Sequence, residues 1–351
     1  MKIIFDNIIY SLQHHGGISV VWTNLISRML NVHHDILFIE YDGCNNNISR
    51  KTFDIPSSLI DNHSSHLMCL RRYLNPKVKS EDKFIFHSSY FRTCSNINSI
   101  NITTVHDFTY EYFVSNPLKR NIHSHQKFNA IRHSRYIVCI SENTKKDLLK
   151  FLPDVNPDKI FVIYNGISDD FYKIDNAKSS RDYILFVGNR NGYKNFDKVI
   201  ESVGISGKTL FIVGKKLTVA EESMLKRYNC KYNYLGFVDD KELNTLYNNA
   251  YCLIYPSSYE GFGLPVIEAQ RAGCPVIAYN GSSISEICDD KSLLVDDIST
   301  AKLLEKIKML SDKSICEKIV SAGLENSSRY TWDKALSKYG ELYEKAYNDC
   351  L

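Results

Sequence analysis

The sequence predicts two α/β domains, each built on a doubly wound parallel sheet. Three observations support this fold class. The chain has 351 residues, more than one ordinary domain contains. Short apolar runs alternate with helical patterns, and this alternation starts again after residues 166–182. The apolar runs carry few polar residues, as expected of parallel strands covered by helices on both faces.

In the first half, six runs are predicted strands and two segments are predicted helices. The strands are residues 2–8, 35–41, 83–89, 102–108, 136–141 and 159–166. The helices are residues 19–30 and 141–152, and Ser141 is a suitable cap for the second. These elements make up a first domain over residues 1–166.

The second half repeats the alternation and then becomes helical. Its predicted strands are residues 183–189, 208–214, 233–238, 251–257 and 274–280, and its predicted internal helices are residues 196–203, 241–250 and 265–273. Helical patterns follow at residues 299–310, 313–327 and 331–347. Because no strand follows the last helix, we expect this helix to cross back onto the first domain. The predicted domains are therefore residues 1–166 plus about 332–351, and residues 167–331.

Composition predicts a globular protein of the cytoplasm. Hydrophobic residues make up 44% and charged residues 24% of the chain. No apolar segment is long enough to span a membrane, and the first residues do not resemble a signal peptide. The ten cysteines are scattered without a metal-binding spacing, which favours reduced thiols and argues against a zinc site.

The charge is unevenly distributed along the chain. Residues 1–165 carry 19 basic and 14 acidic residues, whereas the remainder carries 24 and 26. Residues 112–141 contain no acid, and residues 71–79 form a second basic cluster. These clusters are either ordinary solvated faces or a surface for anionic lipid headgroups or a pyrophosphate-bearing acceptor. Nucleic acid is a weaker hypothesis, since no recognition motif accompanies the charge.

The stretch EGFGLPVIEA, residues 260–269, combines two carboxylates with a predicted helix start. Pro265 suits the first turn of a helix that begins near Leu264. The backbone amides at that start are expected to bind phosphate, and they belong to Phe262, Gly263 and Leu264. Glu260 and Glu268, on either side, suit hydroxyl groups better than an anion. A nucleotide sugar carries both kinds of group.

This stretch has the glutamate-x7-glutamate pattern of retaining glycosyltransferases with the GT-B fold, and the chain resembles family GT4 in particular. Further stretches match in the expected order: HHGGIS, TVHDF, CISENTKKDL, IYNGI, FVGNRNGYKN and a terminal helix with Trp332. The resemblance therefore covers nearly the whole chain. It implies two Rossmann-like domains with a C-terminal helix crossing back to the first. It also implies that the second domain binds the sugar nucleotide, that the first binds the acceptor, and that the chemistry occurs in the cleft between them.

The resemblance also implies roles for individual residues. Glu268 accepts hydrogen bonds from the nucleotide ribose, Glu260 lies near the donor sugar, and residues 262–264 hold phosphate or sugar oxygens. Lys194 and Arg190 are the cations that stabilise the leaving diphosphate. Here the chain departs from the common pattern, because Asn189 follows Gly188 where arginine is frequent.

Other residues are expected around the substrates. Gly16 and Gly17 would let backbone amides approach the diphosphate, and His106 would lie near the transferred sugar. The nucleotide pocket is expected to be lined further by Lys215, Phe237 and Val238. The simpler alternatives are a plain turn for the glycines, a satisfied core or capping histidine, and surface charges for the glutamates and cations. No Asp-x-Asp sequence occurs, so neither a metal nor another cofactor is expected.

The sequence thus predicts a retaining hexosyltransferase that uses front-face substitution. GDP-sugars such as GDP-mannose or GDP-fucose are favoured slightly over UDP- and dTDP-sugars. The expected acceptor is a glycan or a polyprenyl-pyrophosphate-linked saccharide of O-antigen or capsule synthesis, at the inner face of the plasma membrane. The alternatives are a sugar-nucleotide epimerase of the same fold and a non-catalytic nucleotide-sugar-binding subunit. A dehydrogenase is weaker still, because no GxGxxG sequence follows a strand.

Overall fold

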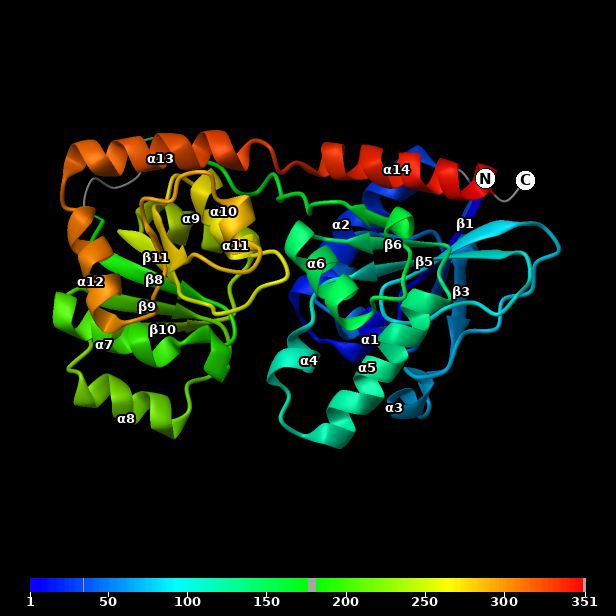
Figure 1. The fold of residues 1–351 in the computed structure, drawn as a ribbon, viewed down its shortest axis with the longest axis horizontal. Helices are drawn as coiled ribbons and strands as arrows, with labels where there is room; N and C mark the ends of the chain where they lie inside the picture. Colours follow the sequence, from blue (N-terminus) through cyan, green and yellow to red (C-terminus); the bar gives the residue numbers. More distant parts are fainter. Residues whose placement is uncertain (34, 176–180, 350–351) are drawn as a thin grey trace. The chain divides into compact units, whose positions relative to one another are not determined.

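The computed structural model describes residues 1–33, 35–175 and 181–349 (Figure 1). The chain forms two compact units. Unit 1 consists of residues 1–166 together with 332–351, and unit 2 consists of residues 167–331. Each unit has its own parallel sheet, as the alternation of strands and helices predicted.

Unit 1 contains a seven-stranded sheet in the order β3-β2-β1-β4-β5-β6-β7. The strands are β1 (Lys2–Asp6), β2 (Ile36–Tyr41), β3 (Ile60–His63), β4 (Phe84–Ser88), β5 (Ser99–Val105), β6 (Tyr136–Cys139) and β7 (Ile160–Val162). All neighbouring strands are parallel; Ile3 of β1, for example, lies opposite Ile36 of β2 and Ile85 of β4. The sheet interior is apolar because β1, β4 and β6 are buried along nearly their whole length.

Helices cover both faces of the unit 1 sheet. They are α1 (Ile9–Leu12), α2 (Gly17–Val32), α3 (Met68–Arg71), α4 (Thr109–Phe113), α5 (Pro117–Arg132), α6 (Glu142–Phe151) and α14 (Trp332–Asn348). In Figure 1, α2 and α14 lie on one side of the sheet, with α4 and α5 on the other. The last helix therefore does return to the first domain. It is tied to β4 by a hydrogen bond of 2.6 Å between the Tyr343 hydroxyl and Nδ1 of the fully buried His87.

Unit 2 contains a six-stranded parallel sheet in the order β10-β9-β8-β11-β12-β13. Its strands are β8 (Tyr183–Val187), β9 (Thr209–Val213), β10 (Tyr232–Gly236), β11 (Cys252–Tyr255), β12 (Val276–Tyr279) and β13 (Leu294–Val295). Its helices are α7 (Phe196–Ser206), α8 (Val219–Arg227), α9 (Asp240–Asn249), α10 (Leu264–Arg271), α11 (Ile284–Ile287), α12 (Thr300–Met309) and α13 (Lys313–Ser327). Figure 1 shows α7 and α8 on one side of this sheet and α9, α10 and α13 on the other.

Several elements differ from the sequence predictions. The strand β3 was not expected, because its residues IDNH are polar and lie at the exposed edge of the sheet. The helix α5 was not expected either, since few apolar residues mark its buried face. Its capping signals were nevertheless present, with Asn116 accepting from the Lys119 amide and Pro117 in the first turn. The capping box of α8 was also overlooked.

Within the described part of the chain, no helix has the length and apolar character that crossing a membrane requires.

A buried ion pair lies at the centre of the unit 1 sheet. Asp6 ends β1 and is 0% exposed, and its carboxylate pairs with the guanidinium of Arg92, which is 2% exposed. The Arg92 Nε donates to Asp6 Oδ2 at 2.8 Å, and a second guanidinium nitrogen donates to the Tyr41 hydroxyl at 2.9 Å. The Ser88 hydroxyl donates to Asp6 Oδ2 at 2.7 Å. This network joins β1, β2 and β4 by polar contacts within an apolar sheet.

Replacing Arg92 with methionine is expected to destabilise unit 1 by about 3–5 kcal/mol, because a buried carboxylate then loses its partner. Denaturant unfolding followed by circular dichroism measures this loss. The matched control is Arg132→Met, which removes an exposed ion pair with Asp154 and is expected to cost about 0–1 kcal/mol. Equal stability losses in the two variants would contradict the assigned role of the buried pair.

Candidate active site

The start of α10 is set by a glycine in a conformation that other residues rarely adopt. Gly263 caps the helix with φ +104° and ψ 48°. A Cβ atom at this position would lie 2.5 Å from Cδ1 of Ile284, so a side chain here would require Ile284 to shift. The helix begins at Leu264 with Pro265 in its first turn, which confirms the predicted helix start. As expected of a first turn, the Gly263 and Leu264 amides donate to no acceptor within the described ranges.

Two of the predicted site residues contact each other before this turn. Lys194 Nζ and Glu260 Oε1 form an ion pair in which both side chains are largely buried, at 12% and 14% exposure. Lys194 Nζ also lies 3.4 Å from the hydroxyl of Tyr255, which hydrogen-bonds to Glu260. Burial, followed by the charge of Glu260, raises the pKa of Tyr255 well above its ordinary value, so this hydroxyl stays protonated. The three groups form one polar cluster at the carboxyl ends of β8 and β11.

Hydrogen bonds hold the Glu260 loop against the segment before α11. The Glu260 amide donates to the Ser282 hydroxyl at 2.9 Å. The Ser283 hydroxyl contacts the carbonyl oxygens of Glu260 and Phe262 at 2.9 and 2.8 Å. Ser282 itself has a positive φ of 49°. These contacts explain how an irregular loop keeps its carboxylate in one position.

The loop that carries Lys194 is fastened in the same way. Asn195 adopts a left-handed conformation with φ 50°, which asparagine tolerates better than most residues. Its side-chain amide donates to the carbonyl of Pro256 and the hydroxyl of Ser258, both at 2.8 Å. The Ser258 amide donates in turn to the Tyr193 carbonyl at 2.8 Å. Lys194 and Glu260 are therefore positioned by adjoining, mutually bonded loops.

Glu268 lies inside α10, one turn beyond its start. The hydroxyl of the fully buried Tyr247 donates to Glu268 Oε2 at 3.2 Å. Burial, together with the negative charge of Asp240, raises the pKa of Glu268 to about 8, and the Tyr247 hydrogen bond opposes this shift. The carboxyl group is thus largely protonated at neutral pH until a ligand that donates hydrogen bonds favours its ionised form.

Arg190 makes different contacts from those expected of a phosphate ligand. Its Nε pairs with Glu221 at 2.7 Å, and its Nη2 donates to the carbonyl oxygens of Lys215 and Lys216 at 2.6 and 2.8 Å. The side chain is 5% exposed, and its Nη1 is buried without a hydrogen-bond partner in the described residues. Since Glu221 also closes the capping box of α8, Arg190 connects the Lys194 loop to this helix.

The remaining predicted donor residues follow the carboxyl ends of three strands. Gly188 and Gly214 directly follow β8 and β9, Gly236 ends β10, and each of the three has a positive φ. The Gly214 amide donates to the Gly236 carbonyl at 2.7 Å, and a Cβ on Gly214 would lie 2.6 Å from the Gly188 carbonyl oxygen. The glycines therefore let these strand ends approach closely. The residues beyond them reach the surface, and they are Asn189, Lys215, Phe237 and Val238.

Unit 1 contains a cavity of about 240 Å³ next to the end of β5. His106, the first residue after β5, lines this cavity, as do Gln13 and Ile18 on either side of the predicted Gly16–Gly17 turn. This turn begins α2, as expected of the glycine pair, and Gly16 accepts a hydrogen bond of 2.8 Å from the Ser19 hydroxyl. The structure thus brings the glycine turn and His106 to the same region of unit 1.

The electrostatic environment of His106 keeps its ring neutral. Burial lowers the pKa of His106 to about 4; Asp107 opposes this shift and the charge of Lys127 adds to it. Lys127 Nζ donates to the Asp107 carbonyl at 2.9 Å and pairs with Glu111 at 2.7 Å. A neutral imidazole can donate or accept one hydrogen bond at each nitrogen, which suits contact with a sugar hydroxyl.

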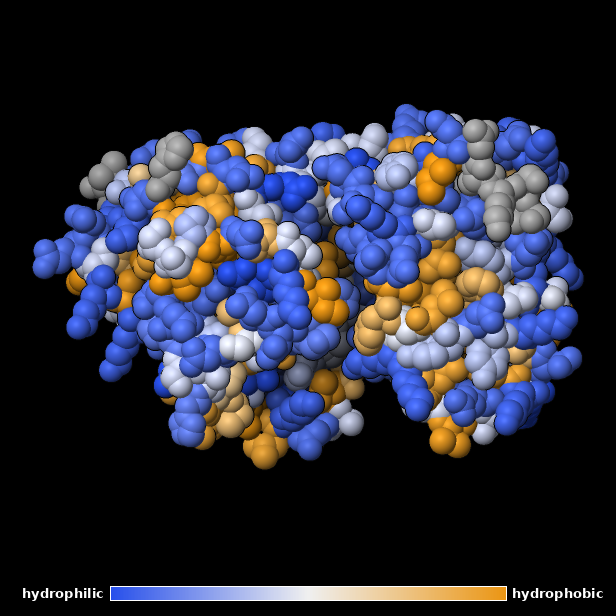
Figure 2. Space-filling model, turned by 180° about the vertical axis from the view of Figure 1, so that it is seen from behind, coloured by the Kyte–Doolittle hydropathy of each residue, from blue (hydrophilic) through white to orange (hydrophobic). Residues whose placement is uncertain are grey.

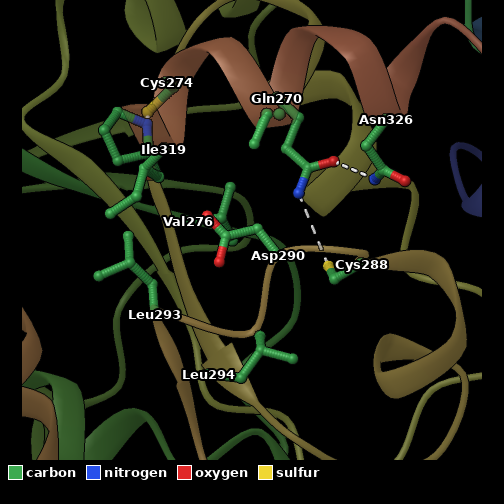
Figure 3. Close-up of a pocket in the computed structure, with 12 residues that line it drawn as sticks. Gln270, Cys274, Val276, Cys288, Asp290, Leu293, Leu294, Ile319 and Asn326 are labelled. Carbon is green, nitrogen blue, oxygen red and sulfur yellow. Dashed lines mark hydrogen bonds between the residues drawn. The ribbon is translucent and has the colours of Figure 1, made fainter. Parts of the chain in front are cut away.

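A second, much smaller cavity in unit 2 lies between α10, α13 and the segment around Cys288 (Figure 3). Its volume of about 20 Å³ has room for roughly one water molecule. Asn326 donates to Gln270 at 2.6 Å, and Gln270 in turn contacts Cys288 Sγ at 3.7 Å (Figure 3). These contacts fasten α13 to α10, so this cavity belongs to the packing of unit 2.

Metal ligands are not grouped in this structure. Among the residues that it describes, no three or more histidine, cysteine, aspartate or glutamate side chains are placed to hold a metal ion.

Sequence reasoning missed several residues of these sites. Tyr255 was not singled out, although a polar residue at the carboxyl end of a buried strand is the same signal that identified His106. Tyr247 was also missed, because its contact with Glu268 joins α9 to α10 and no local pattern predicts that contact. Arg72 and His123, which line the unit 1 cavity, come from segments read only as basic clusters.

Comparison with known proteins gives two family matches that together cover most of the chain. Residues 15–171 match the model of Glycosyltransferase Family 4, and residues 168–325 match that of Glycosyl transferases group 1. An uncharacterized glycosyltransferase of Methanocaldococcus jannaschii is 24% identical over 98% of both chains. The O-antigen chain mannosyltransferase B of Escherichia coli is 36% identical over 115 residues, which span 32% of this chain and 29% of that protein.

The solved structure of the sucrose-phosphate synthase from Thermosynechococcus elongatus has a similar fold, with a TM-score of 0.74 over 99% of this chain and 100% of that one. The sequence identity of 15% limits this likeness to the fold. The two parallel-sheet units, the returning helix α14 and the two family matches agree with one another. The chain belongs to the group 1 glycosyltransferases of family GT4, whose members are retaining hexosyltransferases with the GT-B fold.

Proposed function

We propose that this protein transfers a hexosyl group from a nucleoside-diphosphate sugar to a hydroxyl group of a glycan acceptor, with retention of the anomeric configuration. Unit 2 supplies the donor residues, and unit 1 supplies the acceptor residues. The observation that carries the proposal is the contact of Lys194 with Glu260 beside the first turn of α10. One cation, one carboxylate and unpaired amides in the same region match the phosphates and hydroxyls of such a donor.

In the proposed donor complex, each group of unit 2 has a distinct task. Glu268 accepts hydrogen bonds from the ribose hydroxyls, and Glu260 accepts one from the donor sugar. Lys194 and the amides of Gly263 and Leu264 stabilise the charge that develops on the diphosphate as it leaves. Arg190 is expected to assist in stabilising the diphosphate, because its Nη1 is buried without a hydrogen-bond partner in the described ranges. No step requires a metal ion or another cofactor.

The proposed reaction is a front-face substitution. The bond between the anomeric carbon and the phosphate oxygen breaks first, and positive charge develops on the sugar ring. The acceptor hydroxyl then attacks from the side that the phosphate leaves, and the leaving phosphate oxygen takes its proton. His106, held neutral by its surroundings, hydrogen-bonds the transferred sugar. Much of the rate enhancement then comes from positioning and charge stabilisation.

A lipid-linked acceptor is supported by the surface of unit 1. Exposed apolar side chains of α3 and α5 and of their flanking segments lie beside basic residues; they are Leu67, Leu70, Tyr73, Leu74, Leu118 and Ile122. Figure 2 shows orange hydrophobic side chains among blue hydrophilic ones on the surface of this unit. A surface of this composition suits an anionic membrane and a polyprenyl-pyrophosphate-linked saccharide. We therefore propose that the enzyme acts in the cytoplasm at the inner face of the plasma membrane.

The donor base and sugar are proposed from the curated relatives. The names of these proteins include O-antigen mannosyltransferases of Escherichia coli and Salmonella typhimurium, which favours a mannosyl donor and a role in O-antigen or capsule synthesis. Among nucleotide donors, GDP-mannose is therefore the first candidate. GDP-fucose, UDP-sugars and dTDP-sugars follow.

Thermal-shift measurements with GDP, UDP and dTDP, each in the presence of EDTA, test the donor proposal. The correct nucleotide is expected to stabilise the protein by about 2.7 kcal/mol at a concentration of 100 Kd. GDP is expected to give the largest shift. Stabilisation that appears only when a divalent cation is added would contradict metal-independent binding, and no shift with any of the three would contradict the proposed donor class.

Lys194→Ala is expected to lower kcat by roughly 10²–10³, the loss typical of removing one group that stabilises developing charge. The measurement is the initial rate of sugar transfer at saturating donor. Lys198→Ala is the matched control, because Lys198 lies four residues later on α7 and its side chain is 40% exposed in a pair with Glu201. A turnover number equal to that of the control would rule out the phosphate role of Lys194.

The affinity for the free nucleoside diphosphate is expected to rise about tenfold between pH 7 and pH 9. The ribose hydroxyls prefer the ionised carboxylate of Glu268, whose pKa is about 8. Below pH 8 this carboxyl group is mostly protonated in the ligand-free protein, so it must lose its proton when the nucleotide binds, and the affinity is lower. Titration calorimetry at several pH values measures this trend. In the Glu268→Gln variant the affinity should be lower and independent of pH, and a pH trend unchanged by the substitution would contradict the assignment.

A further inference from the structure

The cavity of unit 1 is lined by a cation and by aromatic rings, in addition to groups that can hydrogen-bond a neutral sugar. Besides His106, its lining includes Arg72 after α3, Tyr90 and Phe91 after β4, and His123 of α5. Arg72 and His123 come from the two basic clusters, residues 71–79 and 112–141, which are separate in the sequence. Tertiary structure thus brings a cation from one cluster and an aromatic wall and histidine from elsewhere into one cavity of about 240 Å³.

Arg72 is held in place without a carboxylate partner among the described residues. Its Nη2 donates to the Tyr90 hydroxyl at 2.6 Å, and its guanidinium lies over the rings of Tyr90 and Tyr73 at 5.1 and 5.3 Å. Its Nε is buried and has no hydrogen-bond partner in the described part of the chain. The Gln126 amide holds its backbone carbonyl. A guanidinium fixed in this way is prepared to pair with an anion.

The other charges around the cavity do not neutralise Arg72. Lys127 is paired with Glu111, so these two charges cancel. Asp107 also lines the cavity, beside His106, but within the described residues it forms no ion pair with Arg72. Its carboxylate accepts a hydrogen bond from the Thr109 amide at 2.9 Å. The cavity therefore has a cationic wall at Arg72 and a hydrogen-bond-accepting wall at Asp107. A ligand that matches both walls has an anionic group and a free hydroxyl group.

Aromatic rings form the rest of the lining. Tyr110 and His123 are stacked, with ring centroids 3.6 Å apart and an interplanar angle of 10°. Phe91 meets His123 edge-on at 5.6 Å. Burial lowers the pKa of His123 to about 3, with Lys127 as the next cause, so this ring carries no charge at neutral pH and Nδ1 has no partner in the described residues. Flat rings of this kind suit the apolar face of a sugar ring, and the volume suits a single sugar unit.

We propose that this cavity binds an acceptor sugar unit bearing an anionic group, either a carboxylate or a phosphate, and that Arg72 pairs with that group. The inference rests on the proposed function, because it names the chemical class of the acceptor of that reaction. Arg72 is then a specificity-determining residue. The reacting hydroxyl of the sugar faces His106 and Asp107, while the anion lies at Arg72.

Binding of three free sugars, with the matching nucleoside diphosphate present at saturation, tests this assignment. The probes are D-glucose, D-glucuronate and D-glucose 6-phosphate, measured by ligand-observed NMR at low salt. At least one anionic sugar is expected to bind tenfold or more tightly than glucose, and the tighter of the two identifies the source of the anion. Equal affinity for all three sugars would overturn the proposal.

Substitutions of Arg72 locate the effect. Arg72→Gln is expected to reduce the affinity for the anionic sugar to that for glucose, whereas Arg72→Lys should retain part of the preference because it keeps the charge without the bidentate fork. Arg132→Gln removes an exposed cation of the same helix as His123 and should leave the affinities for the three sugars unchanged. An anion preference that persists in Arg72→Gln would overturn the assignment.

The same samples separate this inference from the proposed function. Nucleoside diphosphate binding depends on unit 2 and is measured without any sugar. If the Arg72 variants also unfold at the wild-type temperature by circular dichroism, unit 1 is folded in them. A wild-type protein that binds the nucleotide but shows no anion preference then counts against the cavity assignment alone. If the wild-type protein binds no nucleotide, the donor proposal fails.

Discussion

The proposed donor site depends on the left-handed turn at Gly263. Its φ of +104° strains any other residue, and a Cβ atom there would require the Ile284 side chain to shift. This turn starts α10, so it determines where the helix amides point and places Glu260 in the loop before it and Glu268 within the first turns after it. The turn therefore fixes the positions of Glu260 and Glu268 relative to each other. Ser282 and Ser283 keep the loop on the outer side of the turn in place.

Most of the buried charges described above have partners within their own unit. Lys194 pairs with Glu260 and Arg190 with Glu221 in unit 2, and Lys127 pairs with Glu111 in unit 1. Pairing lowers the cost of keeping each charge away from water and holds the side chains in position. In the proposed donor complex, a phosphate at Lys194 adds a second anion to the existing pair with Glu260, which holds the cation in place before the donor binds. Arg72 differs, since no carboxylate in the described ranges pairs with it.

The fold was largely readable because parallel strands and amphipathic helices leave strong local patterns. The buried strands of both sheets, apart from the two-residue strand β13, agree with the prediction, as does the start of α10 at Leu264. The edge strand β3 and the helix α5 were not predicted, because an exposed strand needs no apolar run and α5 has few apolar residues on its buried face. β3 is recognised by its pairing with β2, and α5 by its Asn116 cap. A search for apolar periodicity detects neither feature.

The sequence by itself determined the residue types of the site: the two glutamates, the cations at residues 190 and 194, the glycine turns and a histidine after a strand. These come from local rules, since strand ends, helix starts and positive φ values depend on neighbouring residues. Only the tertiary structure decided which of these groups meet. It placed Lys194 against Glu260, paired Arg190 with Glu221, placed Glu268 near Tyr247 and Asp240, and brought Arg72 to the cavity of His106. Such contacts join segments far apart in the chain, and their charges and pKa values depend on burial, which no local pattern encodes.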